Sequence, residues 1–360
     1  MNLADYFLQS FRLLLLPFSI LYGWGVWIRN RLYDKELLSS TAFNLPVICV
    51  GNLSVGGTGK SPMIEYLTRM LQHEYRLAIL SRGYKRKTRG YVRAIEGTTA
   101  LEIGDEPMQF HRKFPEVEVV VGEKRVEAIP MLLQDAPLTE LILLDDGFQH
   151  RAIRPGLSIL LTDSSNLFTR DFFLPTGDLR DEQSSMYRAD LIVVTKCDSN
   201  ISDEQRQQII QELAPSEKQE IYFSTIHYGT PYHLFDSNNS TALNNSHEVL
   251  LVTAIANVKP LKNYLHDQVH TYDMLSYSDH HIFTADDLHD IQARYQKLPA
   301  GKSLILTTEK DAVRLLKFKS ELEFLPVYVL PVTHQFLFDG EIAFQNRVRS
   351  FLRTFQKKYS

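Results

Sequence analysis

Short aliphatic and β-branched runs alternate along the chain with segments whose apolar residues recur every three or four positions. The runs predict buried strands, and the spaced positions predict helices with one apolar face. Strands followed by helices in this order are typical of a doubly wound parallel sheet, so we expect an α/β fold. The first strands are expected at 47–50, 77–80, 117–121, 140–146, 157–161, 191–194 and 221–225.

A second, smaller α/β unit is expected after a polar stretch at 236–247, which is typical of a flexible loop near a domain boundary. Its expected elements are strands at 249–254, 270–277, 304–307 and 327–330, and helices near 258–265, 285–297 and 341–355. The pattern therefore divides the chain into an N-terminal segment (1–35), a core domain (36–228) and a C-terminal domain (229–360).

Composition adds little to this division. The chain has 360 residues and a formal net charge of −4, so no overall basicity favours nucleic acid as a partner. Cys49 and Cys197 each lie at the end of an apolar run. We interpret them as buried free thiols in a reducing compartment, because their spacing fits neither a disulfide framework nor a metal site.

A glycine-rich turn after the strand at 47–50 ends in Gly59-Lys60-Ser61, and an amphipathic helix follows. This order is the context that makes a phosphate-binding P-loop credible, although Ser54 stands where the usual first glycine would be. Lys60 is placed to reach a β/γ-phosphate pair, and the Ser61 hydroxyl is a ligand for Mg²⁺. The expected nucleotide-binding residues are Ser54, Val55, Gly56, Gly57, Thr58, Gly59, Lys60 and Ser61.

The strand at 140–146 ends in two carboxylates, Asp145 and Asp146. Alone, such an ending is an ordinary turn. Beside a P-loop it is favoured as the second group of magnesium ligands. The stretch Thr195–Asp198 resembles the guanine-reading motif of GTPases, so a P-loop GTPase and a membrane-associated nucleotide-binding regulator stay open as alternatives.

The N-terminal segment carries an uncharged, strongly apolar run at 13–28, interrupted by Pro17 and two glycines. A spanning helix needs roughly 20 apolar residues, so this run is short. Flanking arginines and two tryptophans suit a helix that lies at a membrane interface, and a helix packed on the domain is the alternative. We expect a monotopic attachment, and we expect deletion of the first 30 residues to leave nucleotide binding intact.

Three further stretches allow more than one interpretation. The basic loop at 81–89 is either solvated or in contact with an anionic substrate or an acidic lipid surface. Asp105 fits a helix N-cap, with Pro107 in the first turn. In Asp279-His280-His281 the aspartate can orient an imidazole, but adjacent histidines share no helix or strand face, so no zinc site is expected.

Taken together, these motifs resemble the tetraacyldisaccharide 4′-kinase family of lipid A biosynthesis. The substitution of Ser54 for the first glycine is a habit of that family, whereas Thr176 and Asp178 depart from its pattern in the stretch 175–180. The matching stretches are 51–62, 80–84, 104–107, 145–150, 175–180, 279–281 and 308–311.

The resemblance implies ATP and Mg²⁺ as cofactors and phosphorylation of the 4′-hydroxyl of a tetraacyldisaccharide 1-phosphate, at the cytoplasmic face of the bacterial inner membrane. It implies that Asp105 is the base, assisted by His280, so that the two domains must close over the substrates. Lys60 is the further catalytic residue, and no obligate protein partner is expected. Substrate contacts are expected at Arg82, Gln149, His150 and Arg180.

Overall fold

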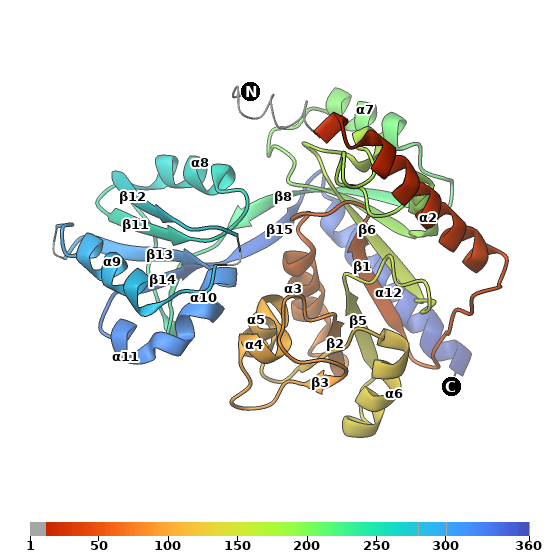
Figure 1. Ribbon diagram of the computed structural model, residues 1–360, viewed down its shortest axis with the longest axis horizontal. Helices are drawn as coiled ribbons and strands as arrows, with labels where there is room; N and C mark the ends of the chain where they lie inside the picture. Colours follow the sequence, from red (N-terminus) through yellow and green to blue (C-terminus); the bar gives the residue numbers. More distant parts are fainter. Residues whose placement is uncertain (1–11, 280, 300, 360) are drawn as a thin grey trace.

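The structure is a computed structural model that describes residues 12–279, 281–299 and 301–359. It consists of a large α/β unit and a smaller one, and two paired strands, β8 and β15, run from one to the other (Figure 1). The doubly wound α/β fold expected from the sequence is confirmed.

The described residues of the large unit form a nine-stranded sheet in the order β15-β8-β7-β6-β1-β5-β2-β4-β3. Every strand from β8 to β4 is parallel to its neighbours, and the edge strands β15 and β3 are antiparallel. The strands are β1 (Val47–Asn52), β2 (Leu77–Ser81), β3 (Val92–Arg93), β4 (Glu118–Val121), β5 (Leu141–Asp145), β6 (Leu157–Asp163), β7 (Leu191–Thr195), β8 (Glu220–Tyr228) and β15 (Val332–Phe336).

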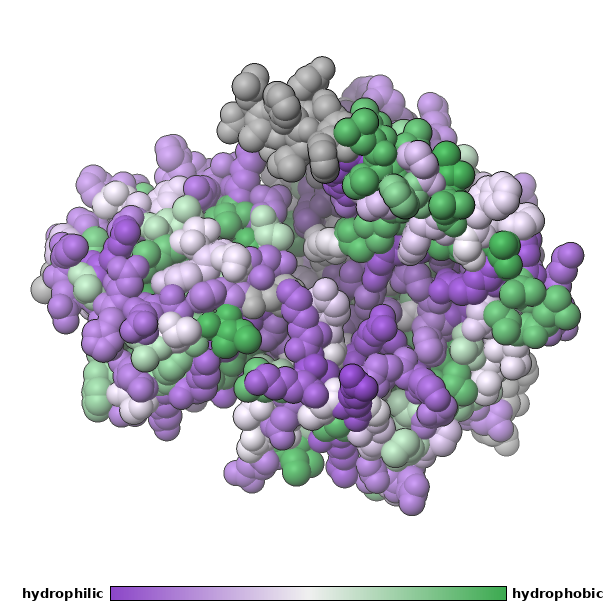
Figure 2. Space-filling model, in the orientation of Figure 1, coloured by the Kyte–Doolittle hydropathy of each residue, from purple (hydrophilic) through white to green (hydrophobic). Residues whose placement is uncertain are grey.

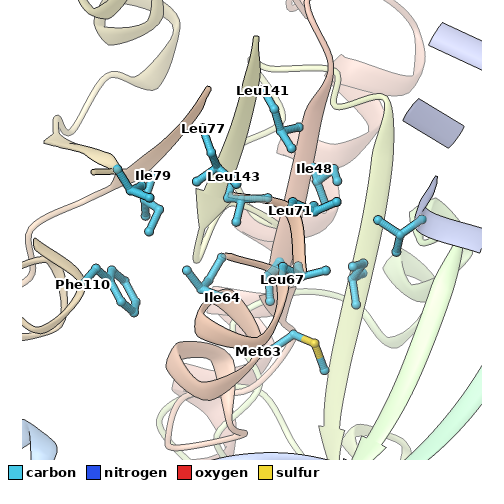
Figure 3. Packing of buried hydrophobic residues seen from close by; sticks show 14 of the residues in the cluster. Ile48, Met63, Ile64, Leu67, Leu71, Leu77, Ile79, Phe110, Leu141 and Leu143 are labelled. Atoms are coloured by element: carbon cyan, nitrogen blue, oxygen red, sulfur yellow. The ribbon is translucent and has the colours of Figure 1, made fainter. Parts of the chain in front are cut away.

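Helices cover both faces of this sheet, which is why its central strands are mostly apolar and are buried on both faces. Ile48 of β1 faces α3, whose Ile64, Leu67 and Leu71 are fully buried (Figure 3). Cys49, the next residue, faces α6 on the other side. The helices of the unit are α2 (Leu16–Asp34), α3 (Lys60–Leu71), α4 (Ala100–Ile103), α5 (Asp105–Lys113), α6 (Arg125–Asp135), α7 (Asp203–Leu213) and α12 (Gly340–Tyr359), with short 3₁₀ turns at Phe168–Arg170 and Gln183–Arg188.

The smaller unit has its own six-stranded sheet, in the order β10-β9-β14-β13-β11-β12, with an apolar cluster on each face. Its strands are β9 (Tyr232–His233), β10 (Asp236–Ser240), β11 (Glu248–Thr253), β12 (Thr271–Ser276), β13 (Ser303–Thr308) and β14 (Val327–Leu330). Its helices are α8 (Lys259–Gln268), α9 (Ala285–Tyr295), α10 (Glu309–Leu315) and α11 (Lys319–Leu322), with a 3₁₀ turn at Leu316–Phe318.

The C-terminal segment differs from the sequence-based division, which placed all of 229–360 in the smaller domain. β15 pairs with β8, and α12, drawn in blue, lies against the large sheet (Figure 1). Phe344, Val348 and Leu352 of α12 are fully buried in the core beneath α3 and β1. Periodicity predicted an amphipathic helix here, but it does not say which of two sheets the apolar face covers.

Helix α2 is unusual because its apolar side chains face outward. Phe18 and Trp24 are 62% and 69% exposed, whereas Ser19 and Asn30 are buried. Figure 2 shows the apolar side chains, in green, gathered over this helix. Among the described residues, no helix combines the length and the apolar character that crossing a membrane requires.

Candidate functional site

The P-loop lies between β1 and α3, at the carboxyl-terminal edge of the large sheet. β1 ends at Asn52, and Gly59 adopts a left-handed conformation (φ +86°) immediately before α3 begins at Lys60. Gly56 also has a positive φ of +105°, so the loop turns at positions that favour glycine. Within the described part of the chain, the Thr58 hydroxyl is buried without a hydrogen-bond partner. The predicted loop 54–61 therefore carries one unsatisfied hydroxyl and ends at the N-terminus of a helix, which favours an anion.

Two cations meet one carboxylate beside this loop. The Nζ of Lys60 lies 3.6 Å from Oδ1 of Asp146 and donates to Oδ1 of Asn52 at 3.0 Å. Arg180 donates to both carboxylate oxygens of Asp146, at 2.8 and 3.0 Å. Burial alone would raise the pKa of Asp146, but Lys60 and Arg180 hold it below its usual range. The site thus concentrates positive charge at the end of β1 and β5.

The second carboxylate has a different environment. Asp145 ends β5, is buried and accepts a hydrogen bond from the hydroxyl of Ser81 at 2.9 Å. Burial, and then the charge of Asp146, raise the pKa of Asp145 to about 6. The two aspartates at the end of this strand are therefore electrostatically unlike.

Ser61, Asp145 and Asp146 form a donor set that fits Mg²⁺. A hydroxyl and two carboxylates supply hard oxygen ligands, and Mg²⁺ usually takes one or two carboxylates together with phosphate oxygens and water. Ser61 lies in the first turn of α3, and both aspartates lie at the end of β5, which pairs with β1. The parallel pairing of the two strands therefore places these oxygen donors at the same edge of the sheet.

His334 supports the P-loop from beneath, and nothing in the local sequence predicted it. Its Nε2 donates to the carbonyl oxygen of Gly59 at 2.8 Å, and its Nδ1 accepts from the hydroxyl of Ser224 at 3.0 Å. Burial lowers the pKa of His334 to about 4, and the charge of Lys196 adds to the shift. The contact joins residues 275 positions apart, so only the folded topology reveals it.

We expect His334→Gln to reduce the acid sensitivity of folding. The folded pKa of about 4 lies below the unfolded value of 6.5, so stability is lost as pH falls through this window. For wild type the loss between pH 7 and pH 5.5 is about 1 kcal/mol from this group. Glutamine keeps a donor and an acceptor but does not titrate. Urea unfolding of both proteins at the two pH values measures the difference, and equal losses would contradict the prediction.

Thr195, the first residue of the Thr195–Asp198 stretch, also supports the P-loop. The Thr195 hydroxyl donates to the carbonyl oxygen of Thr58 at 2.9 Å, and Lys196 pairs with Asp163 at 2.7 Å. Asp198 is exposed and accepts from the backbone N–H of Asn200. The stretch that resembles a guanine-reading motif therefore begins at the end of β7, and it contacts the P-loop through Thr195.

The predicted substrate residues lie around the same sheet edge. The Gln149 amide donates to the carbonyl oxygen of Asn52 at 2.5 Å, and Nε2 of His150 is buried without a partner in the described structure. Burial lowers the pKa of His150 to about 4, and nearby guanidinium groups add to that shift. Those groups are Arg125, Arg82 and Arg29. A cluster of positive charge therefore lies next to the P-loop.

Asp105 lies in the first turn of α5, and Gly104 (φ +94°) occupies the N-cap position that the sequence assigned to Asp105. Its Oδ2 lies 2.5 Å from Nη2 of Arg314 in α10 of the smaller unit. Two further ion pairs join these helices: Glu106 with Lys310 at 3.2 Å, and Lys113 with Glu309. The candidate base therefore lies where the two units meet.

Of the two histidines in the Asp279–His281 motif, the structure describes His281. His280 lies outside the described residues. His281 pairs with Asp287 at 2.8 Å and stacks on Tyr277.

Comparison with known proteins decides the family. Residues 11–353 match the family described as tetraacyldisaccharide-1-P 4′-kinase. The chain belongs to this family. A tetraacyldisaccharide 4′-kinase of Flavobacterium johnsoniae is 46% identical to it over 333 residues, covering 92% of this chain and 96% of the relative. One of Phocaeicola vulgatus is 41% identical over 346 residues, covering 94% of each.

A solved member of the 4′-kinase family shares the fold. The crystal structure described as the "apo" form of LpxK from Aquifex aeolicus in complex with ATP has a TM-score of 0.74 and 27% identity. The match covers 95% of this chain and 99% of the Aquifex aeolicus chain. These matches confirm the family resemblance drawn from the motifs. They assign the chain to the 4′-kinase family and not to the GTPases.

Proposed function

We propose that the protein transfers the γ-phosphoryl group of ATP to the 4′-hydroxyl of a tetraacyldisaccharide 1-phosphate, giving lipid IVA in lipid A biosynthesis. The observation that carries this proposal is the meeting of Lys60, Arg180 and Asp146 beside a P-loop in a chain of the 4′-kinase family. Phosphoryl transfer depends mainly on positioning and charge neutralisation, and this site provides both.

Both cations act on the phosphates in this reaction. Lys60 begins α3, and we assign it to the β/γ-phosphates. We assign Arg180 to the same phosphates, because it donates to both carboxylate oxygens of Asp146 and shares Oδ1 of Asn52 with Lys60. Ser61, Asp145 and Asp146 would hold Mg²⁺, which would supply charge neutralisation at the phosphates. Asp146 already pairs with both Lys60 and Arg180. When the nucleotide binds, its phosphates take the place of this carboxylate as the anionic partner, so the two cations need little rearrangement.

We assign the role of base to Asp105, with His280 as its assistant. A sugar hydroxyl has a pKa far above 7, so a carboxylate takes its proton only as the new bond forms. Asp105 begins α5, and its neighbour Glu106 lies close enough to Asp145 to influence the pKa of that group. This proximity supports a carboxylate within reach of the transferring phosphate.

The positive cluster around His150 suits the anionic groups of the substrate. Arg82 is exposed, and Arg29 extends from α2 to donate to the carbonyl oxygen of Gln149 at 3.3 Å. We propose that Arg82, Gln149 and His150 contact the lipid substrate at this place, where α2 meets the sheet edge. We assign Arg180, expected from the sequence as a substrate contact, to the nucleotide instead, because it pairs with Asp146 beside Lys60.

We also propose a monotopic attachment through α2 to the cytoplasmic face of the inner membrane. The outward face of the helix is apolar, and basic side chains flank it, as in interfacial helices. The anionic lipid substrate is then drawn from the same surface that holds the helix.

Replacing Phe18 and Trp24 together with serine should weaken binding to anionic vesicles by about 100-fold or more. Removing two exposed aromatic side chains that would be buried in lipid forfeits about 1.5–3 kcal/mol each. Phe324→Ser is the matched control, because Phe324 is 87% exposed but belongs to the smaller unit. Co-sedimentation with vesicles measures binding, and equal binding by all three proteins would refute the attachment.

Transfer of ³²P from γ-labelled ATP to a lipid A disaccharide precursor tests the proposed activity. A labelled product phosphorylated at the 4′ position is the expected result. No transfer, with nucleotide binding intact, would instead support the nucleotide-binding regulator, whose output needs neither Asp105 nor His280.

A further inference from the structure

The buried face of α2 carries two polar residues beside Gly23 and Val26, although the exposed face is apolar. Ser19 and Asn30 are 3% and 2% exposed, and both make hydrogen bonds to one segment, residues 171–182, which we call the Arg180 loop. The Ser19 hydroxyl donates to the Thr176 hydroxyl at 2.7 Å, and the Asn30 amide donates to the carboxylate of Asp181 at 2.8 Å. Buried polar contacts of this kind fix one arrangement, since losing a partner is costly.

More contacts along α2 engage the same loop. Arg12, just before the helix, pairs with Asp178 at 2.7 Å, and the Tyr22 hydroxyl donates to the carbonyl oxygen of Arg180 at 3.2 Å. The amide of Asn30 also donates to Glu182 at 2.8 Å. The helix and the residue Arg12 before it therefore contact the Arg180 loop from Thr176 to Glu182.

The Arg180 loop is in turn paired with the P-loop. The backbone N–H of Val55 donates to the carbonyl oxygen of Asp178, and that of Arg180 donates to the carbonyl oxygen of Leu53, both at 2.7 Å. Ser54 and Leu179 form a bridge between these two bonds. The Arg180 loop therefore holds the backbone of the P-loop in place, and α2 holds the Arg180 loop.

Asp181 is the buried residue that links α2 to Arg180. It is fully buried and also accepts from Arg188 at 2.6 Å and from the Ser185 hydroxyl at 3.0 Å. The adjacent residue, Arg180, donates to Asp146 and to Asn52. Asp181 is therefore bonded in sequence to the residue whose guanidinium group pairs with Asp146.

We propose that α2 is a working part of the nucleotide site, and that Asn30 is a positioning residue that sets Arg180 through Asp181. This inference rests on the proposed role of Arg180 at the phosphates. One helix then has two separable functions: its outer face binds the membrane, and its inner face orders the P-loop and Arg180. The deletion of residues 1–30 is accordingly expected to weaken ATP binding, contrary to the expectation from sequence.

The test compares the two faces of α2. Asn30→Ala should lower kcat about 10- to 100-fold and weaken binding of a fluorescent ATP analogue, because small displacements of a catalytic cation are costly. Its vesicle binding should stay at the wild-type level. Trp24→Ser, on the outer face, should show the reverse pattern. Kinetics are measured in mixed micelles, so that membrane attachment does not limit access to the lipid.

A double-mutant cycle separates positioning from general damage. In an Arg180→Ala background, Asn30→Ala should have almost no further effect on kcat, because it acts through the group already removed. Losses that multiply, or wild-type kcat and ATP affinity in Asn30→Ala, would overturn the proposal. Ser19→Ala, which removes one hydroxyl and little volume, gives a second variant if Asn30→Ala folds poorly. ATP affinity is measured without lipid, so an error in the assigned lipid substrate does not affect this outcome.

Discussion

Lys60→Ala should lower turnover about 100- to 1,000-fold, the usual loss when one preorganised electrostatic contact is removed. Lys60 begins α3, and its ammonium group lies between Asn52 and Asp146 at the end of β1. Alanine leaves Asp146 and the phosphates without one of their two cations, while Arg180 remains. The measurement is kcat for ³²P transfer at saturating ATP, Mg²⁺ and lipid precursor.

Lys196→Ala is the matched control for this result. Lys196 also lies at the carboxyl edge of the sheet, but it pairs with Asp163 and not with the carboxylate of the site. Its replacement should change turnover little and should not alter the preference for ATP over GTP. Near-normal turnover in Lys60→Ala, or a larger loss in Lys196→Ala, would show that the P-loop assignment is wrong.

Asp105→Ala and His280→Ala should each lower turnover strongly with little change in ATP affinity. If the two residues act as one unit, the double variant loses far less than the product of the single losses. The readout is kcat with lipid substrate at saturation. Multiplicative losses would mean independent roles, and the proposed pair would have to be abandoned.

The contact between Asp105 and Arg314 requires its own control, since Asp105 also joins the two units. Asp105→Asn keeps a hydrogen-bond acceptor for Arg314 but removes the basic carboxylate, so it should be nearly as inactive as Asp105→Ala. Glu106→Gln removes the charge of the neighbouring interdomain pair with Lys310. A comparable loss of turnover in Glu106→Gln would indicate that contact between the units, and not proton transfer, explains both results.

The sequence predicted those parts of the site that lie close together along the chain. Loop 54–61 and its helix are specified by glycines and by apolar spacing over a few turns. Asp145 and Asp146 were predictable as neighbours of that loop because parallel strands bring their carboxyl ends to one edge. The family's motif order then supplied roles for Asp105 and His280 that residue chemistry alone left open.

The sequence did not predict contacts between segments that are far apart. Ser19 lies within the apolar run at 13–28 and Asn30 just after it, and their burial against the Arg180 loop becomes evident only when α2 is placed. His334 lies on an edge strand whose pattern gives no sign of a P-loop 275 residues earlier. Propensity and period describe one element at a time, so they do not identify the surface that an element meets.

The return of β15 and α12 to the large sheet affects how this protein folds while it is being synthesised. The strand and helix that complete the nucleotide unit are made last, after the whole smaller unit. While a ribosome is still translating, β8 is a sheet edge and Gly59 lacks its imidazole support, even though the P-loop emerged long before. The nascent chain therefore holds an unfinished ATP site throughout most of its synthesis, and a chain truncated before residue 332 never finishes it.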